Sequence, residues 1–334
     1  IRLPGNKENG IKSGLVKEKD SDLILDYIDI DLPESIITKN QIMMLDILAN
    51  NNWERPIYFT GGSYEESEYI WMKDYLQLDG LVYKLVPIKT SIENNPYEMG
   101  RIDSDLMYDI VKKWSWGNSE SDEIYHDPET RKNSISFRGN LSRLSEKLIS
   151  EGEYEKAEEI LDLAFSKMPI DYYGYYSLWT PLVKSYYDIG KSEKVKEIVQ
   201  KLSFKYSDRL KYFSSLEIFN QYDVGEEIIS DIERFRNLIE TIQESGEKEI
   251  LADQIKSFIS SSEQFNFIYG EYDYYISLSN FLVSLLELNE LEYSMSVIDK
   301  IEEQLIRRVS VFSNIDEDEQ VYYLEGITSD INQY

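Results

Sequence analysis

The stretch LSRLSEKLISEGEYEKAEEILDLAFSKMP, residues Leu141–Pro169, reads as two helices joined by a tight turn. Leu144 and Leu148 are four residues apart, which is the spacing of a buried stripe on a first helix. Gly152 is suited to end that helix, because glycine adopts the left-handed conformation without a steric penalty. Small and apolar residues follow at helical spacing before a terminating proline. They are Ala157, Leu161, Ala164 and Pro169.

The same pattern recurs further along the chain. Gly190 follows Gly152 by 38 residues, close to the ~34-residue period of tetratricopeptide repeats. A third, more divergent copy has Asn289 at the turn, and asparagine is the next-best residue for a left-handed position. Residues 208–260 are strongly helical but do not fit the pattern. The sequence therefore predicts a tetratricopeptide-like α-solenoid over residues 133–334.

The first hundred residues alternate strand and helix signals instead. Strands are predicted over residues 22–32, 55–62 and 80–88, and helices over residues 38–51 and 64–78. The first of these helices begins with a Thr and has a Gln three residues later, which is a capping box. The order β-α-β-α-β predicts a small parallel or mixed sheet with helices packed against it.

The chain is therefore expected to be α+β overall and mostly α. We expect a small α/β domain over residues 1–100, a linker with a short helix over residues 101–132, and the helical repeat domain over residues 133–334. Asp127 and Pro128 suit the N-cap and the first position of a helix at the end of the linker.

Composition limits the function classes. The formal net charge of −28 disfavours binding to nucleic acid and to anionic lipid. The absence of cysteine rules out disulfides and thiolate chemistry. No apolar run is long enough to cross a bilayer. The chain begins at Ile1 without a signal peptide, so we expect it to be an excised piece of a longer protein.

A strand followed by glycines can hold a phosphate, so Thr60, Gly61, Gly62 and Ser63 are candidate ligand contacts. The sequence contains neither of the glycine-rich phosphate-binding motifs. The next predicted helix starts with two glutamates that already compensate its dipole. A structural turn is therefore the simpler interpretation.

Two aromatic clusters are candidate surfaces for a partner or a glycan, with core packing as the alternative for both. His126 is the only histidine and precedes a helix cap, which favours a local hydrogen bond. Among 63 acidic residues the sequence singles out no catalytic pair, and it predicts no catalytic residue, metal site or cofactor. The aromatic candidates are Trp114, Trp116, Tyr172, Tyr173, Tyr175, Tyr176 and Trp179.

An ordered string of motifs resembles a known family. It comprises MLDILANNNWERPIYFTGGSYEE, YLQLDGLVYKLVPIKT, LMYDIVKKWSWGN and the repeat stretch above, and the resemblance runs from about residue 15 to about residue 200. The string is similar to the C-terminal soluble region of bacterial protein O-mannosyltransferase-like membrane proteins. In this resemblance Trp53, Arg55 and Pro56 serve as family markers only.

The resemblance implies a parent protein with an N-terminal membrane bundle that uses a lipid-linked sugar. This chain would then be a non-catalytic module on the periplasmic side of the inner membrane of a Gram-negative bacterium. Its partners would be that membrane domain and an acceptor protein. The alternatives are a stand-alone tetratricopeptide scaffold that binds protein partners, and a hydrolase with an unidentified acid pair.

Overall fold

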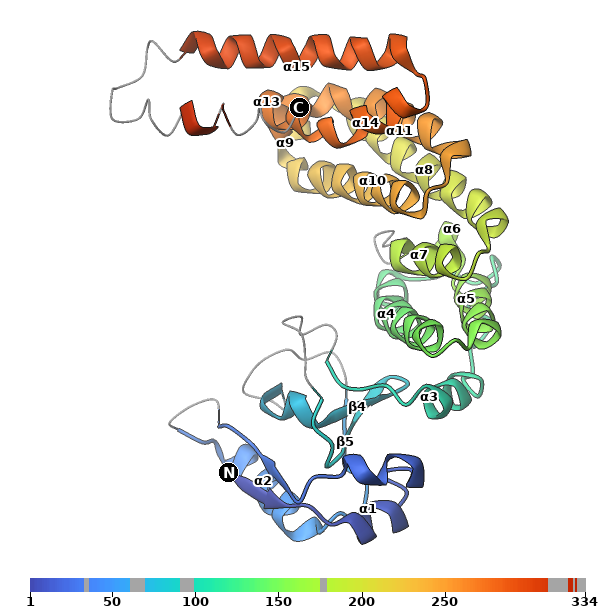
Figure 1. The fold of residues 1–334 in the computed structure, drawn as a ribbon, viewed down its shortest axis with the longest axis vertical. Helices are drawn as coiled ribbons and strands as arrows, with labels where there is room; N and C mark the ends of the chain where they lie inside the picture. Colours follow the sequence, from blue (N-terminus) through green and yellow to red (C-terminus); the bar gives the residue numbers. More distant parts are fainter. Residues whose placement is uncertain are drawn as a thin grey trace. The chain divides into compact units, whose positions relative to one another are not determined.

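The computed structural model describes residues 1–32, 36–60, 70–90, 99–174, 179–311, 324–326 and 328 (Figure 1). The chain divides into two compact units, Ile1–Leu178 and Trp179–Tyr334. The predicted start of the helical repeats at residue 133 thus falls inside the first unit, which contains the first helical hairpin together with the strands.

The strands of the first unit form two small antiparallel sheets. One sheet pairs β1 with β2, and the other has three strands in the order β3-β5-β4. Arg101 extends the edge of β4 by a parallel bridge to Gln77. The strands are β1 (Arg2–Pro4), β2 (Tyr27–Asp29), β3 (Tyr58–Thr60), β4 (Leu76–Asp79) and β5 (Val82–Leu85).

The prediction of a parallel or mixed β-α-β-α-β sheet is therefore wrong, because the described strands pair antiparallel and in two separate sheets. Residues 70–75 form a 3₁₀ helix and Leu76–Asp79 form β4, where the sequence predicted one helix over residues 64–78. The reason is the turn at Asp79-Gly80, because Asp79 and Val82 face each other across a two-residue loop. Gly80 has φ +70°, and glycine at that place is a hairpin signal. Residues 64–69 of that predicted helix lie outside the described residues.

The helices of the first unit begin where their capping residues stand. The capping box of α2 is confirmed, because Thr38 accepts from the Gln41 N–H while the Gln41 side chain accepts from the Thr38 N–H. Asp127 caps α4, and Pro128 is its first residue, as predicted. The helices are α1 (Lys7–Lys12), α2 (Lys39–Asn51), α3 (Ser104–Val111), α4 (Pro128–Ser150), α5 (Tyr154–Lys167) and α6 (Ile170–Tyr173).

The described part of the second unit is helical. Its longer helices pack as hairpins, α7 with α8, α10 with α11 and α14 with α15 (Figure 1). The helices are α7 (Thr180–Asp188), α8 (Ser192–Ser214), α9 (Ile218–Asp223), α10 (Gly225–Ser245), α11 (Lys248–Ser262), α12 (Asn266–Tyr269), α13 (Glu271–Ser277), α14 (Ser279–Glu287) and α15 (Leu291–Val311).

The predicted hairpin turns are confirmed at the backbone. Gly152, Gly190 and Asn289 have φ of +79°, +72° and +61°. In each turn the next residue donates its N–H to a carbonyl five residues earlier, over 2.9 Å. This bond satisfies a carbonyl that the helix end would otherwise leave unpaired. The donor and acceptor pairs are Glu153 with Leu148, Lys191 with Tyr186, and Glu290 with Leu285.

A further hairpin fills the stretch where the sequence showed no repeat. Helix α10 ends at Gly246, whose φ is +75°, and α11 returns beside it. In the second unit the hairpin of α7 and α8 packs against the hairpin of α10 and α11. The first helices of the two hairpins, α7 and α10, are in contact, and so are the second helices, α8 and α11. Helices α8 and α11 run parallel, because contacts pair Lys196 with Glu249 near their starts and Ser207 with Ser257 further along.

Candidate functional site

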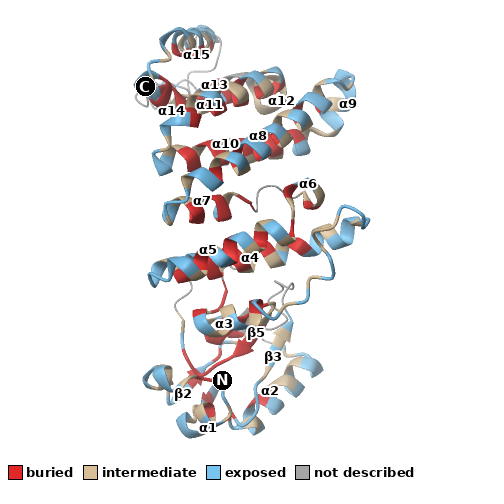
Figure 2. Cartoon of the chain, turned by 90° about the vertical axis from the view of Figure 1, so that its right-hand side faces the viewer, coloured by how far each residue is buried: buried red, intermediate tan, exposed pale blue. Residues whose placement is uncertain are grey.

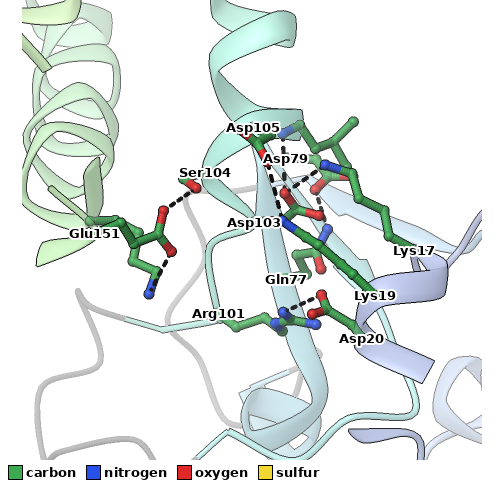
Figure 3. Close-up of polar contacts among 12 residues, drawn as sticks. Lys17, Lys19, Asp20, Gln77, Asp79, Arg101, Asp103, Ser104, Asp105 and Glu151 are labelled. Carbon is green, nitrogen blue, oxygen red and sulfur yellow. Dashed lines mark hydrogen bonds and ion pairs between the residues drawn. The ribbon is translucent and has the colours of Figure 1, made fainter. Parts of the chain in front are cut away.

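Many polar contacts in the described part of the first unit surround residues 101–105, which follow β5 in the chain, pair with the edge of β4 at Arg101 and form the start of α3. Arg101 exchanges backbone hydrogen bonds with β4, donating to Leu76 over 2.9 Å and accepting from Leu78 over 2.8 Å. Asp103 then caps α3 by accepting from the Leu106 N–H over 3.2 Å. These bonds hold Arg101 against β4 and Asp103 at the start of α3, and Figure 3 shows their side chains among those of the surrounding polar contacts.

The segment at residues 17–20 lies against this connection with complementary charges. Lys17 pairs with Asp103 over 2.8 Å, and the Asp103 side chain is only 4% exposed. Arg101 pairs with Asp20 over 2.7 Å. Figure 3 shows cations and carboxylates contributed by both segments, so the two are joined by charge as well as by packing.

The hairpin of α4 and α5 is tied to α3 in the same way. Ser104 donates to Glu151, and Lys112 pairs with Glu159 over 2.7 Å. Asp105 accepts from both Lys19 and Lys156 over 3.2 Å. The hydrogen bond from Lys19, followed by that from Lys156, holds the pKa of Asp105 below its ordinary value. The cluster at residues 101–105 therefore connects three parts of the first unit.

A second polar group lies on one face of the three-stranded sheet. Lys84 pairs with Asp79 over 2.9 Å, and both side chains are almost completely buried. Gln77 donates to Asp79 over 2.8 Å. Tyr58 faces Lys84 across the β3–β5 pair, and burial followed by the charge of Asp79 raises the pKa of Tyr58.

These contacts indicate a structural role. The carboxylates of Asp79, Asp103 and Asp105 each accept from a lysine of another element, so each contact joins two parts of the first unit. Within the described ranges, no group of three or more His, Asp or Glu residues could hold a metal ion.

An exposed apolar face is found on α2. Ile42, Met43 and Ile47 are 56%, 56% and 60% exposed, and the helix is coloured mostly as exposed or intermediate in Figure 2. Leu48 is the only buried residue of this helix. Ile42 on the same helix faces solvent.

The end of α2 shows why the Trp53 motif is distinctive. Asn52 and Trp53 both have positive φ, 46° and 62°, which is unusual for residues with side chains. Trp53 is buried and donates its indole N–H to the Pro4 carbonyl over 2.8 Å. Asn9 donates to the Asn52 carbonyl over 2.9 Å. The motif thus anchors α2 to the first strand, a role that the sequence did not reveal.

The candidate ligand turn is described only at its first residue. Thr60 ends β3 and is exposed, whereas Gly61, Gly62 and Ser63 lie outside the described residues. The structure brings no described side chain into hydrogen-bond contact with Thr60. Ligand contact at this turn stays a prediction.

The aromatic candidates fall into two groups. Trp114 and Trp116 are half-buried and form a three-ring cluster with Phe137, with ring centroids 5.1–5.6 Å apart. Tyr173 and Trp179 are buried core residues, while Tyr175 and Tyr176 lie outside the described residues. A role of these rings in binding a partner or a glycan stays a prediction.

His126 makes the local contact that the sequence favoured. Its Nε2 lies 3.1 Å from the Ser121 carbonyl oxygen, and its ring stacks on Tyr172 at 5.7 Å. Tyr173, which also packs against this ring, donates to the Ser119 carbonyl over 3.0 Å. His126 therefore holds the loop before α4 against α6.

Comparison with known proteins gives one match. Residues 1–106 match the family model described as TMEM260-associated domain 2. The matched stretch contains both sheets, α2 and the cluster at residues 101–105, and covers about a third of the chain. No curated protein and no solved structure matches the chain. Among the residues that the structure describes, no helix is both long and apolar enough to span a membrane.

Proposed function

We propose that this chain is a non-catalytic extracytoplasmic module of a membrane-embedded protein glycosyltransferase that uses a lipid-linked sugar. Two lines support the proposal. Residues 1–106 match a domain associated with TMEM260, which is O-mannosyltransferase-like. The motif string between about residues 15 and 200 is similar to the soluble region of bacterial O-mannosyltransferase-like proteins. We place the module on the periplasmic side of the inner membrane, as the resemblance implies.

The observation that carries the proposal is the exposed apolar face of α2. Contiguous exposed apolar residues on a helix mark interaction sites more often than chance exposure does. This face lies inside the matched domain, and its exposed apolar residues Ile42, Met43 and Ile47 border one exposed carboxylate, that of Asp46. We assign it to docking on the membrane domain of the parent enzyme, where an apolar helix face finds a matching surface.

The helical hairpins supply the second part of the proposal. Stacked hairpins with left-handed turns are the building units of tetratricopeptide-like solenoids, whose surfaces bind proteins. We assign to residues 133–334 such a solenoid, which presents a surface to an acceptor protein or an assembly partner. The purified chain is then expected to show no transferase activity of its own.

Site-specific photo-crosslinking tests the docking assignment. A photoreactive amino acid replaces Ile47 in cells that express the gene from its own promoter. The expected adduct is a polytopic membrane segment of glycosyltransferase type, identified by mass spectrometry. The same amino acid at the exposed Lys12 of α1 is the control and should not give this adduct. Adducts to soluble proteins alone would contradict the proposal, as would sugar transfer by the purified chain.

A stand-alone scaffold is the alternative function, and the regular hairpin turns favour it. In that case the hairpins alone would carry the function, and the face of α2 would be dispensable. Replacing Ile42, Met43 and Ile47 together by Gln discriminates the two. The test uses this chain expressed apart from the membrane domain of its parent: loss of binding to membranes that contain that domain, with partner binding intact, supports the glycosyltransferase module, whereas no effect on membrane binding supports the scaffold.

A further inference from the structure

A polar pocket of about 260 Å³ lies between the parallel helices α8 and α11 of the second unit. Helix interfaces of this kind are normally filled by apolar side chains. Here every lining residue carries a polar group, a hydroxyl, an amide or an ammonium, and none carries a carboxylate. The lining residues are Ser207, Lys211, Ser257, Ser260, Ser261 and Gln264.

Serine hydroxyls from the two helices meet in the pocket. The Ser207 Oγ lies 3.2 Å from the Ser257 Oγ and 3.4 Å from the Ser261 Oγ. Ser261 itself donates to the Ser257 carbonyl. A hydroxyl carries one hydrogen, so when Ser207 donates to Ser257 the hydrogen of Ser257 is left for a ligand.

Two buried polar groups lie on α8 and α11 about one helical turn before the serines of the pocket. Ser203 precedes Ser207 by four residues, and Gln254 precedes Ser257 by three, so helical spacing puts them on the same sides of α8 and α11. They are 5% and 9% exposed, and neither the Ser203 Oγ nor the Gln254 Oε1 has a hydrogen-bond partner among the described residues. Leaving such a group unpaired destabilises the folded chain.

Lys211 provides a positive charge at the mouth of the pocket. Neighbouring cations are paired, since Arg209 contacts Asp231 over 2.6 Å and Lys256 contacts Glu290 over 2.7 Å. Within the part of the chain that the structure describes, Lys211 forms no ion pair. An uncompensated lysine above hydroxyl donors is notable in a chain with a net charge of −28.

We propose that this pocket binds a small oxyanion, namely a phosphate group. Lys211 supplies the charge, and the Ser257 hydroxyl, whose oxygen accepts from Ser207, supplies a neutral donor together with the Gln264 amide. The volume is below the usual range for drug-sized ligands, so it suits an inorganic phosphate or a compact phosphate monoester. This site is independent of the function proposed for α2.

Calorimetric titration of the full chain tests the site, at constant ionic strength, with inorganic phosphate as one probe and glycerol phosphate as the other. Lys211→Met is expected to weaken binding by tenfold or more, and Ser257→Ala by a smaller factor. Lys248→Met, which removes an exposed lysine from the start of the same helix pair, should leave the affinity unchanged. Tighter binding of glycerol phosphate than of phosphate would identify a hydroxylated monoester as the ligand.

Two outcomes would overturn the proposal. One is that the wild-type chain and Lys211→Met bind the phosphate probes with equal affinity, or that neither of them binds. The other is equal weakening by Lys211→Met and Lys248→Met, which would indicate unspecific attraction to surface charge. Thermal unfolding guards against a folding defect, because phosphate should raise the Tm of the wild-type chain and of Lys248→Met but not that of Lys211→Met.

Discussion

Lys84 on β5 and Asp79 on β4 form an ion pair of 2.9 Å, with side chains only 3% and 5% exposed. Removing two charges from water is costly, and their mutual attraction offsets the cost only while both are present. Gln77 adds a hydrogen bond to the same carboxylate. The sheet face that carries this pair therefore depends on both partners.

Lys84→Met should destabilise the protein by about 3–5 kcal/mol, because it leaves the Asp79 carboxylate buried without its cation. The double variant with Asp79→Leu should recover most of that loss. Urea unfolding at neutral pH measures both. Lys19→Met, which removes an exposed cation, is the control and should cost less than about 1 kcal/mol. A double variant as unstable as Lys84→Met would contradict the argument.

Two turn glycines are expected to differ in their tolerance of alanine. Gly152 has φ +79° and nothing within 4 Å of the position of a Cβ, so Gly152→Ala should cost only the backbone penalty of about 1–2 kcal/mol. At Gly80 the Cβ would lie 3.0 Å from Ile110 and 3.3 Å from Trp114, so Gly80→Ala should cost about 1–3 kcal/mol more. Equal losses of stability in denaturant unfolding would contradict this prediction, because they would show that the Trp114 side chain moves aside without an energetic cost.

Tyr269 should make stability fall at alkaline pH. Burial, then its hydrogen bond to Glu233, raises the pKa of Tyr269 from 10.0 to about 12. The folded state therefore holds this proton after the unfolded chain has lost it. Stability from this group is complete below the unfolded pKa and is lost as pH rises towards the folded value.

Comparing urea midpoints at about pH 8 and about pH 11 tests this titration. Tyr269→Phe should show a smaller alkaline loss than the wild-type chain. Tyr125→Phe is the control, because the Tyr125 side chain is 82% exposed. If Tyr269→Phe and the wild-type chain lose stability equally over this range, the assignment is wrong.

Adjacent residues of α2 should respond differently to substitution. Ile47 is 60% exposed, so Ile47→Gln should change the free energy of unfolding by no more than about 0.5 kcal/mol. Leu48 is 8% exposed, so Leu48→Ala should cost about 2 kcal/mol or more. Circular dichroism during urea unfolding measures both. A large loss for Ile47→Gln would mean that the face packs within the chain and is not free for a partner.

The helical hairpins were predictable because their turns are local. Gly152, Gly190 and Asn289 each need a left-handed backbone, and few residues tolerate it. The hairpin at Gly246 escaped detection because it does not keep the period: it follows Gly190 by 56 residues. Helix α8 has 23 residues, and α9 precedes α10, so turn spacing varies while turn chemistry does not.

The sheets were harder to predict, since strand pairing depends on contacts distant in sequence. The apolar residues of Leu76–Asp79 fit the face of a helix as well as one side of a strand. The hairpin turn at Asp79-Gly80 decides in favour of the strand. The cluster at residues 101–105 was equally hidden. Lys17 and Asp103 are 86 residues apart, and nothing in a charge pattern pairs one lysine with one of many acids.

The shared turn geometry of the hairpins also bears on how this protein changes over evolution. Each hairpin closes through a bond between residues five apart, as from Lys191 to Tyr186, and needs no distant segment to form its turn. Whole hairpins can therefore be duplicated, lengthened or deleted while their neighbours keep their own turns. Relatives of this chain are expected to differ in hairpin number and helix length more than in the residues that occupy the turns.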